Sequence, residues 1–495
     1  MIISAFTTIL MMVGVITYLV EREYFGARIT IMRNAISFFI AFVVTFLTGI
    51  FRMILPLACL SLMLLALPAA LRAQDYQALS LAECLDLARE QNPVLGGARE
   101  KVKELVADYD AARSKFFPRL ALLSYSQWID PNRLSSGGGA STQNLFAREG
   151  LTSLTGKQIV FDGLKTYYNT GAARLGRQAQ QQEVARTADE VAYQVKEAFY
   201  RLLEAKENLQ VAAEALKERR EFLKITDAFF HAGKATRLDA FRAKSQTLEA
   251  EQAQVEAENA VRLAREILTR TLGLEEKAGM DIQGRLPEEF IPAAEFNSLW
   301  NQVEQTNPEI KMLKLELAQS QALIKASQAG YFPEVSLQGN VGVRHHDIGG
   351  TKDEWLGGVF MEFPFFEGGL TRAQVAKVSS QYQQMQEKLR ERVNALRVDL
   401  MTGWNEQENA RKGVVTSRQN VATNEEAYAS ALSLYRTDKA IGLDVLTAQV
   451  ELTRSRLSLI SYQVAYEIGQ AKVEQIVGGE GEASMAIKQK EGEEK

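Results

Sequence analysis

Two stretches of the chain measure out the same pair of prolines. Residues 92–118 open on Asn-Pro and close on Phe-Phe-Pro, and residues 307–333 open on Asn-Pro and close on Tyr-Phe-Pro. The prolines of each stretch are 25 residues apart (118 − 93 and 333 − 308). A unit this long that occurs only twice indicates a duplicated domain, because solenoid folds stack three or more repeats to bury a continuous core.

The two copies align at two different offsets. Phe117-Pro118 matches Phe332-Pro333 at an offset of 215 (333 − 118). Further along the chain, Gly163 of Phe-Asp-Gly matches Gly368 of Phe-Glu-Gly at an offset of 205 (368 − 163). The difference lies between these two landmarks, where we expect a loop, since surface loops tolerate insertions and deletions.

Period-two alternation predicts two β-strands in each copy. Val335, Leu337 and Val341 alternate with polar residues, as in a strand with two different faces. The expected strands span about 119–129, 148–161, 334–344 and 354–366. The strand that follows Pro333 has roughly the ten residues that a tilted membrane strand requires.

The stretches that follow the strands predict long helical hairpins. They lack proline and are rich in Ala, Gln, Glu, Lys, Arg and Leu, a composition typical of long helices. From Val184 to Leu216 apolar residues recur by alternating threes and fours, which is a heptad seam. We expect hairpins over 164–273 and 370–477, followed by a disordered charged tail at 479–495.

The N-terminal residues 1–73 have the character of a targeting region. An apolar run that ends near the small residue Ala73 is typical of a secretory signal, but a signal of 73 residues would be far too long. We therefore expect translation to start at Met32, Met53 or a nearby non-Met codon, so that residues 1–31 are not native. The alternative is that two inner-membrane helices lie here.

Composition argues against catalysis and against nucleic-acid binding. The net charge of −4 and the pI near 5.8 predict no nucleic-acid partner. Two cysteines and three histidines leave little material for a metal or cofactor site, and none is expected. Residues 150–158 have the wrong glycine spacing for a phosphate loop, and His345-His346-Asp347 lies in a polar turn without a fourth ligand. We expect a protein that is not an enzyme.

Four strands are too few to close a barrel in a membrane. An open sheet edge cannot face lipid, because its N–H and C=O groups would find no hydrogen-bond partner there. Several chains must therefore share one barrel, and three chains supply twelve strands. Residues at the boundaries between helix and strand then fit a membrane interface, although a soluble turn that buries its aromatics is the alternative. These interface residues are Phe117, Pro118, Phe332, Pro333 and Pro364.

Taken in order and in duplicate, these motifs resemble the TolC-like outer-membrane efflux proteins. The resemblance covers roughly residues 79–478 and rests on the proline spacing, VFDG at 160–163, PFFEGG at 364–369 and two similar hairpin turns. It implies a mainly α-helical fold of two tandem repeats, at 79–278 and 293–478, whose homotrimer forms a twelve-stranded β-barrel in outer-membrane lipid and an α-helical periplasmic tunnel. It also implies a passive exit duct in a Gram-negative bacterium that docks, through a periplasmic membrane-fusion adaptor, onto an inner-membrane pump of RND, ABC or MFS type.

The resemblance also assigns roles at the hairpin tips. Acidic residues ring the closed periplasmic pore in this family, and Asp444 falls on one such position, while the second ring falls on Thr447. Asp239 and Tyr435 match a latch between hairpins in which a tyrosine hydroxyl meets a carboxylate, but the usual basic partner falls on Ala440. Residues expected to dock the adaptor are Gly233, Lys234, Leu238, Lys439, Gly442 and Leu443.

Simpler structural roles compete with these assignments. Thr236 stands three residues before Asp239, the spacing of a helix-capping box. Asp444 is preceded at that spacing by Ile441, so we expect it to act there only on the helix dipole. For the whole chain the alternative is a membrane-anchored periplasmic coiled-coil scaffold. Drug efflux, metal-ion efflux and protein secretion use similar ducts, so the resemblance leaves the cargo open.

Overall fold

The chain divides into two units, Met1–Asp75 and Tyr76–Lys495. The computed structural model describes residues 79–129, 147–274, 281–346 and 350–478, all of which belong to the second unit. The predicted signal region and the charged tail lie outside the described residues, as does the loop that absorbs the change of offset.

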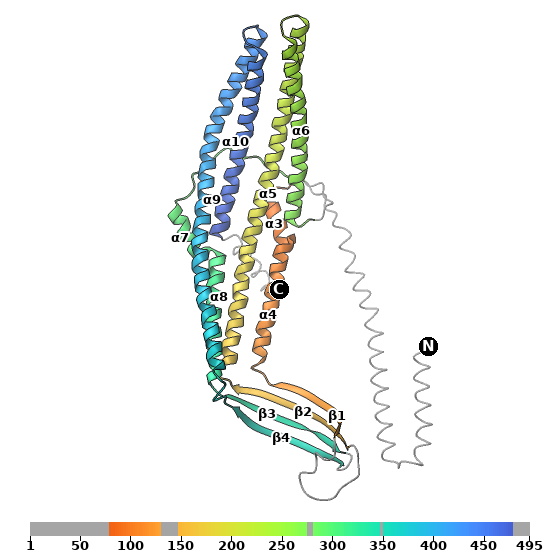
Figure 1. Ribbon diagram of the computed structural model, residues 1–495, viewed down its shortest axis with the longest axis vertical. Helices are drawn as coiled ribbons and strands as arrows, with labels where there is room; N and C mark the ends of the chain where they lie inside the picture. The colour runs from red at the N-terminus through yellow and green to blue at the C-terminus, as the bar shows by residue number, and fades with distance from the viewer. Residues whose placement is uncertain (1–78, 130–146, 275–280, 347–349, 479–495) are drawn as a thin grey trace, which may run out of the picture. The chain divides into compact units, whose positions relative to one another are not determined.

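Each copy contributes two short helices, a β-hairpin and a long helical hairpin (Figure 1). The first copy comprises α3 (Leu81–Gln91), α4 (Pro93–Ser114), β1 (Arg119–Ile129), β2 (Ala147–Phe161), α5 (Lys165–His231) and α6 (Arg237–Leu272). The second comprises α7 (Phe296–Thr306), α8 (Pro308–Gln328), the 3-10 turn η2 (Ala329–Tyr331), β3 (Glu334–His346), β4 (Gly350–Glu362), α9 (Leu370–Arg436) and α10 (Gly442–Val477). The lengths support duplication, because α5 and α9 both have 67 residues and α6 and α10 both have 36.

The four strands form one antiparallel sheet in the order β1-β2-β3-β4. The two hairpins have equivalent registers, since Ser124 pairs with Thr152 and their counterparts Gly339 and Gly357 also pair. Strands β2 and β3 join one copy to the other. Among the residues that the structure describes, β1 and β4 therefore each have one unpaired edge.

Strand β4 lies four residues earlier than the sequence pattern predicts (350 rather than 354). Its pairing with β3 begins at His346 and Gly350, immediately beside the short connection between them. Its end at Glu362 has a physical reason, since Pro364 has no N–H to donate to a ladder. Among the described helices, none is at once long and apolar enough to cross a membrane.

The long helices pack as two hairpins, α5 with α6 and α9 with α10, and α10 also packs against α5 (Figure 1). The predicted heptad seam is buried, with Val195 and Leu202 fully inaccessible to solvent. Two equivalent cores form where a short helix packs on each long hairpin, one around Cys84 of α3 and the other around Trp300 of α7.

The Asn-Pro motif connects the end of one helix to the start of another. Asn307 Oδ1 accepts a hydrogen bond from the backbone N–H of Ile310 at 3.0 Å, which caps α8. Its Nδ2 donates to the carbonyl oxygen of Ile476 near the end of α10 at 2.8 Å. Asn92 makes the equivalent pair of contacts, capping α4 and donating to Thr271 of α6 at 2.8 Å. One side chain thereby satisfies unpaired groups of two helices.

A glycine in the left-handed region completes each junction. Gly273 has a φ of +78°, and a Cβ there would lie 2.5 Å from the carbonyl oxygen of Gln91. Gly478 has a φ of +73°, and a Cβ there would lie 2.8 Å from Cδ of Pro308. The equal proline intervals follow from this geometry. The first proline of each pair starts a helix at the junction, and the second stands just before a strand.

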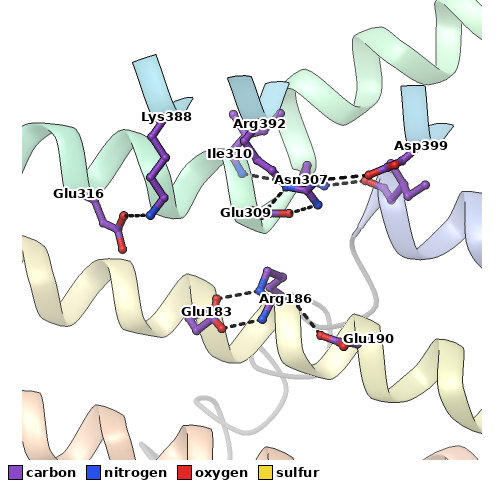
Figure 2. Close-up of polar contacts among 11 residues, drawn as sticks. Glu183, Arg186, Glu190, Asn307, Glu309, Ile310, Glu316, Lys388, Arg392 and Asp399 are labelled. Atoms are coloured by element: carbon purple, nitrogen blue, oxygen red, sulfur yellow. Dashed lines mark hydrogen bonds and ion pairs between the residues drawn. The ribbon is translucent and has the colours of Figure 1, made fainter. Parts of the chain in front are cut away.

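Ion pairs fix α8 against α9 next to the second junction (Figure 2). Arg392 of α9 reaches Glu309 in the first turn of α8 with its Nε 2.7 Å from Oε1, and its Nη1 lies 3.3 Å from Asp399. Glu309 also suits the helix N-terminus, where the backbone dipole favours negative charge. The start of α8 is therefore held by a cap, a carbonyl contact and a bidentate ion pair.

We predict that Asn307→Asp destabilises the protein although it keeps the capping oxygen. The variant loses the donor to Ile476 and sets a carboxylate against that buried carbonyl, a change that costs about 1–3 kcal/mol. Thermal unfolding of the full chain in detergent measures this, with Asn301→Asp on the exposed face of α7 as the matched control. Equal midpoints for the two variants would contradict the role given to the Asn307 amide.

Candidate functional site

The sheet has one strongly apolar face. Because side chains alternate across a strand, the even-numbered residues of β1 and the odd-numbered residues of β4 lie on the same side. Trp355 is 79% exposed and Leu122 is 73% exposed in the single chain. Other exposed members of this face are Leu120, Trp128, Leu154, Leu337, Val341, Val359 and Met361. An exposed apolar surface of this extent is typical of a membrane or protein contact.

The opposite face of the sheet carries ion pairs and polar side chains, together with the apolar side chains of Leu123, Leu356 and Phe360. Lys157 Nζ lies 3.1 Å from Glu334 Oε1, and Arg344 Nε lies 2.6 Å from Glu354 Oε2. Ser336 and Gln338 also point to this side and hydrogen-bond to each other at 2.9 Å. A sheet with one apolar and one polar face suits a wall between lipid and water.

The predicted interface residues lie where helices meet the sheet. Pro118 and Pro333 stand immediately before β1 and β3, and Pro364 follows the end of β4. Phe117 and Phe332 are 60% and 54% exposed, so neither is a buried turn residue in the single chain.

The hairpin tips of the two copies meet around Tyr435. This side chain of α9 is 6% exposed and its ring lies 5.2 Å from that of Phe222 and 5.4 Å from that of Phe229, both on α5. Its hydroxyl donates to Oγ1 of the fully buried Thr226 at 3.4 Å. Tyr435 therefore contacts the other hairpin, as a latch residue must, and its hydroxyl partner in this structure is a threonine.

The two tip carboxylates cap their own helices. Asp239 accepts from the backbone N–H of Thr236 at 3.1 Å and donates its own N–H to the Thr236 hydroxyl, which completes the expected capping box of α6. Asp444 accepts from the N–H of Ile441 at 3.2 Å. This second contact was not expected. Isoleucine lacks a hydroxyl, but its backbone can still supply half of a box. Asp444 remains exposed at the tip.

A contact between the tips was missed by the sequence reasoning. Lys234 Nζ lies 2.9 Å from Asp438 Oδ2 and so joins the turn of one hairpin to the turn of the other. Both turns contain a left-handed residue at equivalent positions, Gly233 with a φ of +72° and Asp438 with a φ of +57°. The repeat offset of 205 could have indicated that the two turns are equivalent, because it aligns Asp438 with Gly233 (438 − 233).

The predicted docking residues differ in accessibility. Leu238 and Leu443 are exposed, as are Lys234 and Lys439. Gly442 is buried, and a Cβ there would lie 3.6 Å from the rings of Phe222 and Tyr435. It belongs to the packing beneath the tip surface.

Charged side chains also bridge the seam between α5 and α10. Arg456 of α10 contacts Glu218 of α5 at 3.4 Å and Glu425 of α9 at 3.0 Å. Further along the seam, burial raises the pKa of Glu467, which receives a hydrogen bond from Tyr200 of α5. Removing a carboxylate from water disfavours its ionised form.

The combination of an amphipathic sheet and long paired helices defines a membrane-embedded protein with a long helical extension. The sequence profile of the outer membrane efflux protein family matches residues 84–274 and 299–479, one segment in each copy. The chain belongs to this family. Its members form efflux ducts and are not a class of enzyme.

Individual relatives agree with this assignment. Outer membrane efflux protein BepC of Brucella suis biovar 1 (strain 1330) is 22% identical over 392 residues, which cover 77% of this chain and 81% of BepC. The outer membrane channel CmeC of Campylobacter jejuni has the same fold with a TM-score of 0.73 at 15% identity, covering 82% of this chain and 88% of CmeC. The outer membrane channel MtrE of Neisseria gonorrhoeae, solved in an open state, gives 0.69 at 19% identity, with 81% and 89% covered.

The protein is thus an exit duct of an efflux system, located in the outer membrane and extending into the periplasm. The assignment decides against the periplasmic scaffold, which would leave the amphipathic sheet without a use.

We predict that Glu467 makes stability increase as pH falls below neutrality. Its folded pKa is raised, so the folded state binds the proton more tightly than the unfolded chain, and this contribution is lost as pH rises through the folded pKa. Glu467→Gln should raise the unfolding midpoint at neutral pH and flatten its change as pH falls from neutrality toward the ordinary glutamate pKa of 4.5. Glu451→Gln, on an exposed position of the same helix, is the control. An unchanged slope in the Glu467 variant would refute the prediction.

Proposed function

We propose that three copies of this chain form one passive duct whose twelve strands close a barrel in the outer membrane. The observation that carries the proposal is the four-stranded sheet, with its apolar face and its two unpaired edges. A lone sheet of this kind would expose edge N–H and C=O groups to lipid, whereas a closed barrel satisfies all of them. The predicted interface residues, from Phe117 to Pro364, then lie at the periplasmic boundary of the bilayer.

The helical part carries the duct through the periplasm to its partners. We assign the exposed tip residues Lys234, Leu238, Lys439 and Leu443 to the contact with a periplasmic adaptor. A groove of about 500 Å³ between α5, α6 and α10 supports the same assignment. Six of its thirteen lining residues are alanines of α5 and α6, so the backbone of a partner helix can approach closely there. The adaptor links the duct to an inner-membrane pump, which selects the cargo and supplies the energy. The duct itself catalyses no reaction.

The gate lies at the hairpin tips. Tyr435 and the pair Lys234–Asp438 hold the two hairpins of one chain together, and Asp239 fixes the start of α6 beside them. Three Asp444 carboxylates around a narrow pore would raise the local concentration of cations and repel anions. The cap that Asp444 forms with Ile441 is compatible with this role, because the side chain stays exposed.

Membrane fractionation together with an efflux assay tests the duct. The mature chain should be found in the outer membrane as a trimer that resists mild SDS, and it should restore export when it replaces the native duct of a deletion strain. A water-soluble monomer that needs no detergent would refute the proposal.

Bilayer conductance tests the gate. We predict that Asp444→Asn reduces cation preference and divalent block, because the ring of negative charge is lost while the side-chain oxygen that caps α10 is kept. Asp227→Asn, at an exposed position near the other tip, should leave both quantities unchanged. If the two variants conduct alike, Asp444 does not line the pore.

A further inference from the structure

We propose that β4 of one chain pairs with β1 of a second copy in a defined register, with Met361 opposite Ser124 and Gly358 opposite Gln127 of that copy. This inference rests on the proposed trimeric duct and specifies the subunit interface that closes it. The β2–β3 pairing already joins the first copy of the repeat to the second. Because β4 is the counterpart of β2 and β1 is the counterpart of β3, that pairing is a template for the contact between chains.

The register follows from the two repeat offsets. Gly156 pairs with Gly339 inside the chain. Adding 205 to the first number and subtracting 215 from the second gives Met361 and Ser124. The same operation converts the pair Ser153–Gly342 into Gly358–Gln127. The offsets are those that relate the two observed hairpin registers, so they hold in the folded sheet as well as in the sequence.

The faces of the sheet agree with this register. Met361 and Ser124 both belong to the apolar face, as do the next two rungs of the same parity. A shift by one residue would place Trp355, Val359 and Met361 of β4 beside the face of β1 that carries Arg119 and Gln127. The proposed register therefore keeps lipid-facing and water-facing residues continuous across the subunit boundary.

Side-chain sizes are complementary at two of the new rungs. Gly357 lies opposite Trp128 on the apolar face, and a Cβ on Gly357 would meet no atom of the described part of its own chain within 4 Å. A large aromatic side chain across from an edge glycine covers the exposed backbone. On the polar face Gly358 lies opposite Gln127. Inside the chain the equivalent rung also pairs a glycine with a larger residue, Gly342 with Ser153.

Charge is complementary as well. The ion pair Lys157–Glu334 crosses from β2 to β3 inside the chain. Its counterpart between chains joins Glu362 to Arg119, with the two charges exchanged between the strands. Among the described residues neither Arg119 nor Glu362 has an ion-pair partner, and both are exposed. A second copy in the proposed register supplies each with an opposite charge.

A glycine turn beyond the sheet supports the same neighbour. Gly163 has a φ of +67°, and a Cβ there would lie 2.7 Å from the carbonyl oxygen of Ala329 and 2.8 Å from Cβ of Phe332. Its counterpart Gly368 has a φ of +61°, but a Cβ there would meet no atom of the described residues within 4 Å. The repeat offsets place Ser114 and Phe117 of the neighbouring chain against Gly368. The neighbouring Leu164 also has a positive φ, so backbone conformation alone does not require a glycine in this turn.

Disulfide trapping in the full chain tests the register. The pair Ser124→Cys with Met361→Cys and, separately, the pair Gln127→Cys with Gly358→Cys are introduced into the chain. The two residue pairs are three residues apart along the strands. One is therefore a hydrogen-bonded pair and the other a non-hydrogen-bonded pair, whose Cα atoms lie closer together. At least one of the two has a spacing that suits a disulfide. Strand order separates β1 from β4 by two strands within one chain, a distance of about 14 Å, so any bridge must join two chains. Mild oxidation of outer membranes should convert the monomer band on a non-reducing denaturing gel into covalent trimers.

Leu120→Cys with Met361→Cys is the matched control. It keeps the same face but is displaced by four residues, about 13 Å along the strand, and should cross-link about tenfold less. If the control pair cross-links instead of the proposed pairs while the protein still exports cargo, the register is overturned and the duct stands. If the chain stays monomeric and no pair cross-links, the interface and the duct are overturned together.

A charge exchange gives a second readout that does not depend on oxidation. Arg119→Glu should lower the temperature at which the trimer dissociates in SDS, and Arg119→Glu combined with Glu362→Arg should restore it. Failure of the double variant to recover, with correct insertion into the outer membrane, would remove the ion pair from the interface.

Discussion

The need to pair every backbone N–H and C=O group inside a bilayer determines most of this structure. Four strands leave two open edges, and those edges can be satisfied in lipid only by strands of another chain. The alternation of side chains then assigns one face to lipid and one to water. Trp355 and Leu122 on one side and the Lys157–Glu334 pair on the other follow from that single constraint.

Duplication lets one chain solve the same structural problem twice. Asn92 and Asn307 each join the end of a long helix to the start of a shorter one, and each works beside a left-handed glycine. These junctions set the distance from the helical hairpins to the sheet, which is why the proline intervals are equal. The two repeats differ at their hairpin tips, where they contact each other. These contacts are made by Tyr435, Thr226 and the Lys234–Asp438 pair.

Most elements could be predicted because their signals are local. Heptad spacing, strand alternation and the capping residue Thr236 each act within a few residues of the chain, and each led to the correct kind of element. The predicted range of β4 lay too far along the chain. Apolar residues continue past Glu362, whereas the hydrogen bonding of the strand stops before Pro364. The hydrogen bond from the backbone N–H of Ile441 to Asp444 could not be predicted from the capping-box pattern. Its donor is a backbone group that any residue at position 441 would provide.

The sequence by itself determined the duplication, the number and faces of the strands, the length of the helices and hence the class of protein. These properties depend on periodicities that a short segment carries alone. Tertiary structure decided which strands of the two copies pair, which aromatic residues enclose Tyr435 and which carbonyl each junction asparagine reaches. Such contacts join residues about 170 to 210 positions apart. They form only when two long helices come together, and no local pattern specifies which partner each side chain will meet.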